Sequence, residues 1–228
     1  MINLTIGENK VKLPNDWSEI TIETYARLLE IYAKNNCLNK DDQENSSEEQ
    51  FNTDTIKANM EALAFLTNVD IETIKKCKSH EVNNVLGYMT KFLSEVEHKE
   101  FEEVEDTKLS FEFKNKTYYY PEFKFKDTTF GDYIEASQLN NLIDKQKGGR
   151  FSVLPEQIAI LCKEVDEPSY DEKIIRQKTR LFEKLPMNKV WDFVFFLTKQ
   201  TIIWERSFQT YSKTATELVT DIQEKTGT

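Results

Sequence analysis

The sequence predicts a mainly helical α+β fold made of two related halves, each a β-hairpin followed by three or four helices. A hairpin pattern occurs twice, and amphipathic helical periodicity fills most of the chain that follows each copy. A heptad series near the end of the chain predicts an additional long C-terminal helix. We therefore divide the chain into a first half at residues 1–106, a second half at residues 107–198 and a helical extension at residues 199–228.

The hairpin pattern is clearest at residues 108–121. Apolar and polar residues alternate on both sides of a predicted turn at Asn115-Lys116, because asparagine tolerates the positive φ of a tight hairpin turn. The alternating apolar positions are Leu109, Phe111, Phe113, Tyr118 and Tyr120. Phe123 and Phe125 continue the alternation and predict a possible third strand.

The same plan occurs at the start of the chain. Residues 2–13 alternate in the same way around a predicted turn at Gly7-Glu8-Asn9, and a helix is expected soon after each hairpin. Thr21 and Thr129 are the predicted N-caps of these two helices. Similar features in the same order favour an internal duplication. The alternative is a chance similarity between two ordinary hairpin-plus-helix patterns.

Acidic residues are concentrated in the first half. The net charge is −10; residues 1–107 hold 11 Lys and Arg against 22 Asp and Glu, whereas residues 108–228 hold 19 against 18. Two patches hold most of the acidic residues of the first half: residues 39–54, a polar stretch with one aromatic residue that suggests a loop or disordered insertion, and residues 95–106, which suggest an acidic linker. Asp54, at the end of the first patch, is a candidate helix cap. Such a chain is a poor partner for a phosphate backbone, so nucleic acid is an unlikely ligand.

Compartment and chemistry follow from what the sequence lacks. It has no apolar run long enough to span a membrane. Cys37, Cys77 and Cys162 are odd in number and too far apart for a zinc site or a disulfide framework, so we expect reduced thiols in a cytosolic setting. His80 and His98 are the only histidines, and no phosphate-binding, dinucleotide-binding, hydrolase or zinc-protease motif is present. We therefore predict no catalytic residue, no metal and no cofactor. A hydrolase would need an acid–base pair with shifted pKa values in a pocket.

The heptad series predicts a partner-binding surface. Apolar or small residues step alternately by three and four positions through Val194, Leu197, Thr201, Trp204, Phe208, Tyr211, Ala215, Leu218 and Ile222. Up to Leu197 the stripe is wide enough to belong to the core, and beyond Trp204 it narrows to one seam. We expect Trp204, Phe208, Tyr211, Leu218 and Ile222 to contact a partner. The alternative is that this helix folds back on its own two halves.

Basic residues of the second half form a possible nucleic-acid contact. Lysines interleave with aromatic residues along the second hairpin, as in single-strand stacking platforms, and a basic loop follows at residues 145–150. The candidate contacts are Lys114, Lys116, Lys124, Lys126 and Arg150. The simpler interpretation is a solvated outer face, since the aromatic residues alternate inward.

Three features of the sequence also support a resemblance. They are Leu13-Pro14-x-x-Trp17-x-x-Ile20-Thr21-x-x-x-Tyr25, the acidic insertion after it, and a late Leu185-Pro186-Met187. In these the chain resembles, over most of residues 10–200, small proteins encoded among the structural genes of tailed bacteriophages, especially gut Bacteroides phages including crAss-like phages.

The resemblance implies a non-enzymatic protein of the virion or of its assembly, made in the host cytoplasm. A tail or connector ring or a packaged internal protein would fit, with other virion proteins or copies of the same chain as partners. A tail-assembly chaperone that is not retained in the virion and a nucleic-acid-binding module are the alternatives.

Overall fold

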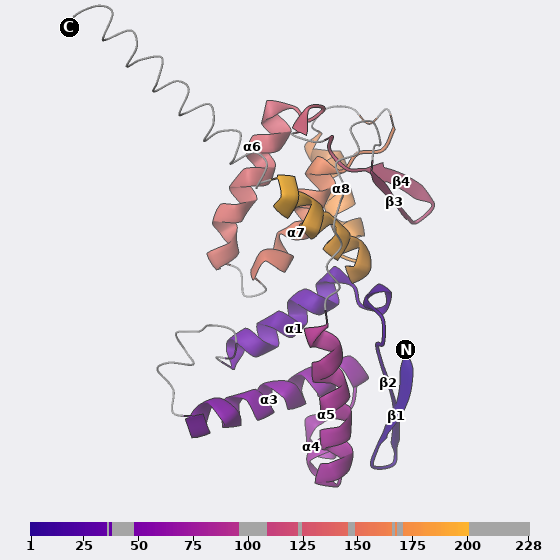
Figure 1. Ribbon diagram of the computed structural model, residues 1–228, viewed down its shortest axis with the longest axis vertical. Coiled ribbons are helices and arrows are strands. Elements are labelled where there is room, and N and C mark those ends of the chain that lie inside the picture. The colour runs from indigo at the N-terminus through magenta and orange to yellow at the C-terminus, as the bar shows by residue number, and fades with distance from the viewer. Residues whose placement is uncertain are drawn as a thin grey trace, which may run out of the picture.

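The protein folds as the expected α+β structure, mainly helical, with two small antiparallel hairpins. The computed structural model describes residues 1–35, 37, 48–95, 109–122, 125–145, 149–165, 167 and 171–200, with the backbone alone at residues 48–52 and 144–145. Figure 1 shows two lobes stacked along the long axis. We call them the first lobe, from β1 to α5, and the second lobe, from β3 to the helix at residues 187–200.

The first lobe packs one hairpin against helices. Its elements are β1 (Ile2–Ile6), β2 (Asn9–Leu13), the 3-10 helix η1 (Trp17–Glu19), α1 (Ile22–Lys34), α3 (Glu48–Thr67), α4 (Ile71–Lys75) and α5 (Ser79–Ser94). The hairpin contacts α3 and α5, and Val11 and Leu13 on its inner face are buried. Its core therefore lies between the hairpin and the helices.

The second lobe repeats this order of a hairpin followed by helices. Its elements are β3 (Ser110–Phe113), β4 (Lys116–Tyr119), α6 (Phe130–Gln138), the 3-10 helices η3 (Leu139–Lys145) and η4 (Gly149–Ser152), α7 (Leu154–Leu161), α8 (Glu172–Phe182) and the helix at residues 187–200. Phe111 and Tyr118 are directly opposite on the two strands and stack at 5.4 Å between ring centroids. Common ancestry of the two lobes stays a prediction.

Helix starts follow the predicted caps in part. The hydroxyl oxygens of Thr21 and Thr129 accept from the backbone N–H groups of Thr24 and Asp132, at 3.2 and 3.1 Å. The predicted cap at Asp54 is wrong, because α3 begins before it, at Glu48. Residues 48–54 of the acidic stretch are therefore helical, and the loop interpretation fails there. The start of α3 at two glutamates agrees with the preference of a helix N-terminus for negative charge.

Both hairpins reverse through two-residue turns. In the first, Ile6 pairs with Asn9, so Asn9 belongs to β2 and only Gly7 and Glu8 turn; Gly7 has a φ of +59°. In the second, Lys114 and Asn115 have φ values of +51° and +63°, which is the type I′ geometry that matches strand twist. The predicted turn at Asn115-Lys116 was thus one residue late.

The predicted third strand is absent at its described end. Phe125 lies in a turn with a φ of +53°, and Phe123 lies outside the described residues. The edge of β4 is partnered instead by Lys163, which exchanges two backbone hydrogen bonds with Tyr119 at 2.8 and 3.1 Å. Lys163, more than 40 residues away in the sequence, thus pairs with the edge of β4 where a strand at residues 123–125 was expected.

Backbone hydrogen bonds join the two lobes. Ile22 N–H donates to the Leu185 carbonyl at 3.0 Å, and Met187 N–H donates to the Ile20 carbonyl at 2.8 Å. Ile20 and Ile22 are buried in the core of the second lobe, although they lie at the start of α1 in the first lobe, on either side of its N-cap Thr21. Lys184 also forms an ion pair with Glu23.

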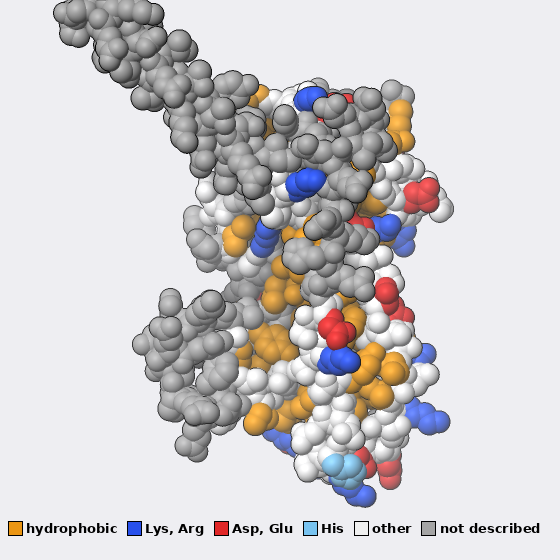
Figure 2. Space-filling view, viewed as in Figure 1, with side chains coloured by type: hydrophobic (Ala, Val, Ile, Leu, Met, Phe, Trp, Pro, Cys, Tyr) orange, Lys and Arg blue, Asp and Glu red, His pale blue; other side chains and the backbone are white. Residues whose placement is uncertain are grey.

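An aromatic cluster fills the rest of this junction. The half-buried rings are Trp17, Tyr25, Phe92, Phe151 and Trp191. Tyr25 of α1 meets Phe151 at 4.7 Å and Trp191 at 5.7 Å, and Trp17 meets Phe92 at 4.8 Å. Figure 2 shows hydrophobic side chains gathered where the lobes meet. We call these five rings, with the backbone bonds of residues 20–23 to 183–187, the lobe junction.

The junction predicts cooperative unfolding. Trp191→Ala should lower the free energy of unfolding by about 2–3 kcal/mol, less than the roughly 3–5 kcal/mol of a fully buried aromatic ring, because Trp191 is half-buried. Calorimetry should show one transition for the parent chain and a broadened or split transition for the variant. Phe130→Ala is the control, since Phe130 is 79% exposed and its loss should change little. Equal effects of both substitutions would contradict a role for the junction.

Candidate functional site

The helix at residues 187–200 carries the first two members of the predicted heptad series, Val194 and Leu197. Its buried positions are Met187, Val190, Phe193, Val194, Phe196 and Leu197. Tyr120, the residue after β4, packs on Phe193 and Phe196 at 5.9 and 5.2 Å, so the helix is held against the second hairpin. The wide apolar stripe predicted up to Leu197 is thus core. The predicted partner contacts Trp204, Phe208, Tyr211, Leu218 and Ile222 lie outside the described residues.

The basic residues proposed for nucleic acid do not present a stacking platform. The rings of Phe111, Tyr118 and Tyr120 are buried in the core, with Tyr118 meeting Phe182 edge-on at 4.9 Å. Burial of these rings leaves no face free for a base. The inward alternation predicted from sequence is confirmed for this hairpin.

The candidate lysines have separate environments. Lys116 forms an ion pair with Glu164 at 2.9 Å, and that carboxylate raises the pKa of Lys116. Lys114 lies in the turn with its ammonium 5.9 Å from the Phe113 ring centre, and Lys126 is exposed. Lys124 lies outside the described residues. Arg150, in contrast, is largely buried, which lowers the pKa of its guanidinium.

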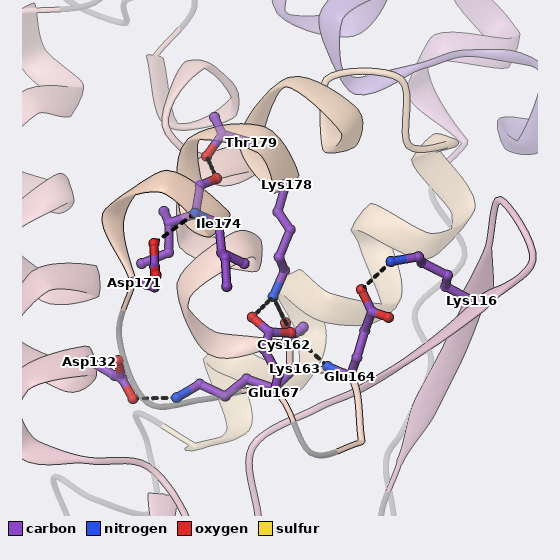
Figure 3. Close-up of polar contacts among 11 residues, drawn as sticks. Lys116, Asp132, Cys162, Lys163, Glu164, Glu167, Asp171, Ile174, Lys178 and Thr179 are labelled. Atoms are coloured by element: carbon purple, nitrogen blue, oxygen red, sulfur yellow. Dashed lines mark hydrogen bonds and ion pairs between the residues drawn. The ribbon is translucent and has the colours of Figure 1, made fainter.

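A buried ion pair organises the polar part of the second lobe. The ammonium of Lys178, on α8, donates to both carboxylate oxygens of Glu167 at 2.7 and 3.0 Å and to the Cys162 carbonyl at 2.6 Å. Only 6% of the Lys178 side chain and 10% of the Glu167 side chain are exposed. Figure 3 shows the three groups converging between α8 and the segment after α7.

Neighbouring contacts fix the same segment at further points. Lys163 pairs with the buried carboxylate of Asp132 on α6 at 2.6 Å, and the Glu167 carboxylate accepts from the Glu164 backbone N–H at 2.8 Å. Together with the Lys116–Glu164 pair, these bonds tie residues 162–167 to the hairpin, to α6 and to α8 (Figure 3). Each donor is matched to an acceptor, which suits a structural brace better than a proton-transfer site.

Lys178, which lies on α8, was not singled out from the sequence. A signal was present, because Ile175, Lys178 and Phe182 are spaced three and four residues apart and form the buried face of this helix. A lysine on an apolar face indicates a buried partner. That partner, Glu167, comes from outside any helix or strand, so no periodic pattern marks it.

Comparison with known proteins adds no relative: no family model, no curated protein and no solved structure matches this chain. Within the described ranges, no cluster of three or more His, Cys, Asp and Glu is placed to hold a metal ion. Nor does any helix among these residues have the length and apolar character needed to cross a membrane.

Because of the buried ion pair, two substitutions on α8 should lower the free energy of unfolding by very different amounts. Lys178→Met should cost about 3–5 kcal/mol of unfolding free energy, because it leaves the Glu167 carboxylate buried without its cation. Arg176→Met should cost less than about 1 kcal/mol, because the Arg176 side chain is 75% exposed and its pair with Glu172 is screened by water. Urea unfolding of both variants measures the difference. Equal costs would mean that the pair does not support the lobe.

The thiols should differ in reactivity. Burial raises the pKa of the Cys162 thiol, and its side chain lies in the core, whereas Cys37 and Cys77 are only half-buried. A thiol reagent at neutral pH should therefore modify the native chain at Cys37 and Cys77 and reach Cys162 only after unfolding. Peptide mapping of the modified native protein checks this; rapid labelling of Cys162 would contradict the packing of α7.

Proposed function

We propose that this protein is a non-enzymatic virion or virion-assembly protein of a tailed bacteriophage, acting through protein–protein contacts of its C-terminal segment. The observation that supports this proposal is that one heptad series begins in the core of the second lobe and continues in the sequence beyond it. Val194 and Leu197, the first two members of the heptad series, are buried in the second lobe. The series continues in the sequence for seven further members, through Ile222. A helix whose first part is buried in one core, and whose continuation has a heptad pattern that needs a second apolar surface, is suited to joining two chains.

The resemblance to phage structural proteins supports the same assignment. Two of its three sequence features contribute to the lobe junction: Trp17 and Tyr25 to its rings, and Leu185-Pro186-Met187 to its backbone bonds. In this proposal the junction makes a rigid body of the two lobes, and the C-terminal segment connects that body to another virion protein or to another copy. A chaperone that leaves the particle would use the same surface.

A nucleic-acid-binding role is the weaker candidate. It requires exposed aromatic rings and free cations along the second hairpin, whereas the rings are buried and Lys116 is paired with Glu164. Arg150 lies in a cavity rather than on the hairpin face. The proposal therefore assigns the C-terminal seam, and not the hairpin, as the binding surface.

Deletion of residues 205–228 tests the proposal. The truncated chain should keep its melting temperature to within a few degrees, because the described core ends before the deleted part, but it should lose self-association or co-purification with other particle proteins. Native mass spectrometry of the purified chain and pull-down from infected cells measure the two kinds of contact. Unfolding or aggregation of the truncated chain would instead assign the segment to the core and overturn the proposal.

Point substitutions make the same test without truncation. Phe208→Asp with Ile222→Asp places charge on the seam, whereas Gln209→Asp with Gln223→Asp adds the same charge at adjacent outward positions of the heptad. The seam pair should weaken association at least about tenfold, and the control pair should not. Equal effects would exclude the seam. Mass spectrometry of purified particles then separates a virion component, which is present, from a chaperone, which is absent although expressed.

A further inference from the structure

A small cavity in the second lobe is separate from the buried ion pair and from the heptad seam. It has a volume of about 180 Å³ and lies between α6, η4, α7 and the helix at residues 187–200. Four polar side chains line it: Ser137 of α6, Asn140 of η3, Arg150 of η4 and Gln157 of α7. Phe125, Tyr133 and Leu197 supply aromatic and apolar walls. Asn140 is exposed, so the cavity opens to solvent beside it.

Arg150 brings a positive charge to this cavity without a counter-charge. In the part of the chain that the structure describes, no carboxylate pairs with its guanidinium, and its Nε is buried without a hydrogen-bond partner. Removal from water is the one cause that lowers its pKa. Lys116, Lys163 and Lys178 of the same lobe are each paired with a carboxylate. A partly buried cation of this kind is stabilised when an anion is bound beside it.

Gln157 brings an unpaired acceptor to the same cavity. Its side chain is 3% exposed, and its Nε2 donates to the Ala136 carbonyl at 3.0 Å and to the Asn140 Oδ1 at 2.9 Å. These two bonds fix the orientation of the amide. The Oε1 atom is left buried without a donor among the described residues, so a group that enters the cavity can donate to it.

The size and the two unpaired groups define the ligand. The volume is below the roughly 300–1,000 Å³ typical of sites for drug-sized molecules, so the ligand is small. The arginine calls for a planar anion, for which a carboxylate is the matching partner. A bound water could donate to Gln157, but it would leave the charge of Arg150 unbalanced. The ligand must therefore combine an anion with a hydrogen-bond donor.

We propose that this cavity binds a small organic acid whose carboxylate pairs with Arg150 and whose hydroxyl or amino group donates to Gln157. The aromatic and apolar walls accommodate a short carbon skeleton. The site is independent of the proposed virion role, because it lies inside one lobe and uses none of the residues assigned to the seam.

Calorimetric titration of the full chain with lactate tests the site, in a chloride buffer free of carboxylates and phosphate and at constant ionic strength. Lactate should bind and raise the melting temperature. Propionate, which lacks the hydroxyl, should bind at least fivefold more weakly, and lactamide, which lacks the charge, should not bind. No heat and no shift with lactate would overturn the proposal, and binding of inorganic phosphate in place of lactate would overturn the assignment to a carboxylate.

Variants assign the two contacts. Arg150→Gln should weaken lactate binding at least tenfold, Arg150→Lys should retain part of it, and Arg180→Gln, at an exposed arginine of α8, should leave it unchanged. Without ligand, Arg150→Gln should melt no lower than the parent chain, because it removes an unpaired buried charge. Unchanged lactate affinity in Arg150→Gln, or an equal loss in Arg180→Gln, would overturn the assignment of Arg150.

Discussion

The lobe junction is the contact on which the rest of the architecture depends. A short exchange of backbone hydrogen bonds between residues 20–23 and 183–187 places the start of α1 against the start of the helix at residues 187–200. These bonds satisfy backbone groups at both helix starts, where a helix has no internal partner for its first N–H groups. The surrounding rings, among them Tyr25 and Trp191, then exclude water from the bonds. Two lobes with separate hydrophobic cores are thereby held as one body.

The second lobe needs polar bracing because one of its segments has no regular structure. The described residues after α7, 162–165 and 167, form no helix or strand, yet Cys162 is fully buried and Lys163 completes the edge of β4. Lys178 supplies three hydrogen bonds to this segment from α8. Burial of such a pair is costly, so its gain is specificity: only one path of the chain places Glu167 and the Cys162 carbonyl on the same ammonium. Breaking the pair should therefore cost more than the pair contributes net, because the remaining charge would be buried alone.

The sequence predicted what local patterns encode and failed where distant segments decide. Alternation located both hairpins and their buried faces, and short polar side chains located the caps at Thr21 and Thr129. The start of α3 was missed because six of residues 48–54 are polar, so that no apolar periodicity in the sequence marks a helix there. The strand expected at Phe125 was wrong because Lys163 completes the β4 edge. The cavity could not be predicted from the sequence, because only the folded chain brings Arg150 and Gln157, which lie on different elements, to one site.

The helix at residues 187–200 connects these features physically. Its Trp191 lies in the lobe junction, its Phe193 and Phe196 hold the second hairpin through Tyr120, and its Leu197 lines the cavity. One rigid helix therefore contributes side chains to the junction, to the packing of the second hairpin and to the cavity wall. The first two members of the heptad series, Val194 and Leu197, are buried on this same helix. In the proposed virion role, a partner bound to the C-terminal seam would act on the lobe junction through this helix, because Trp191 belongs to the junction.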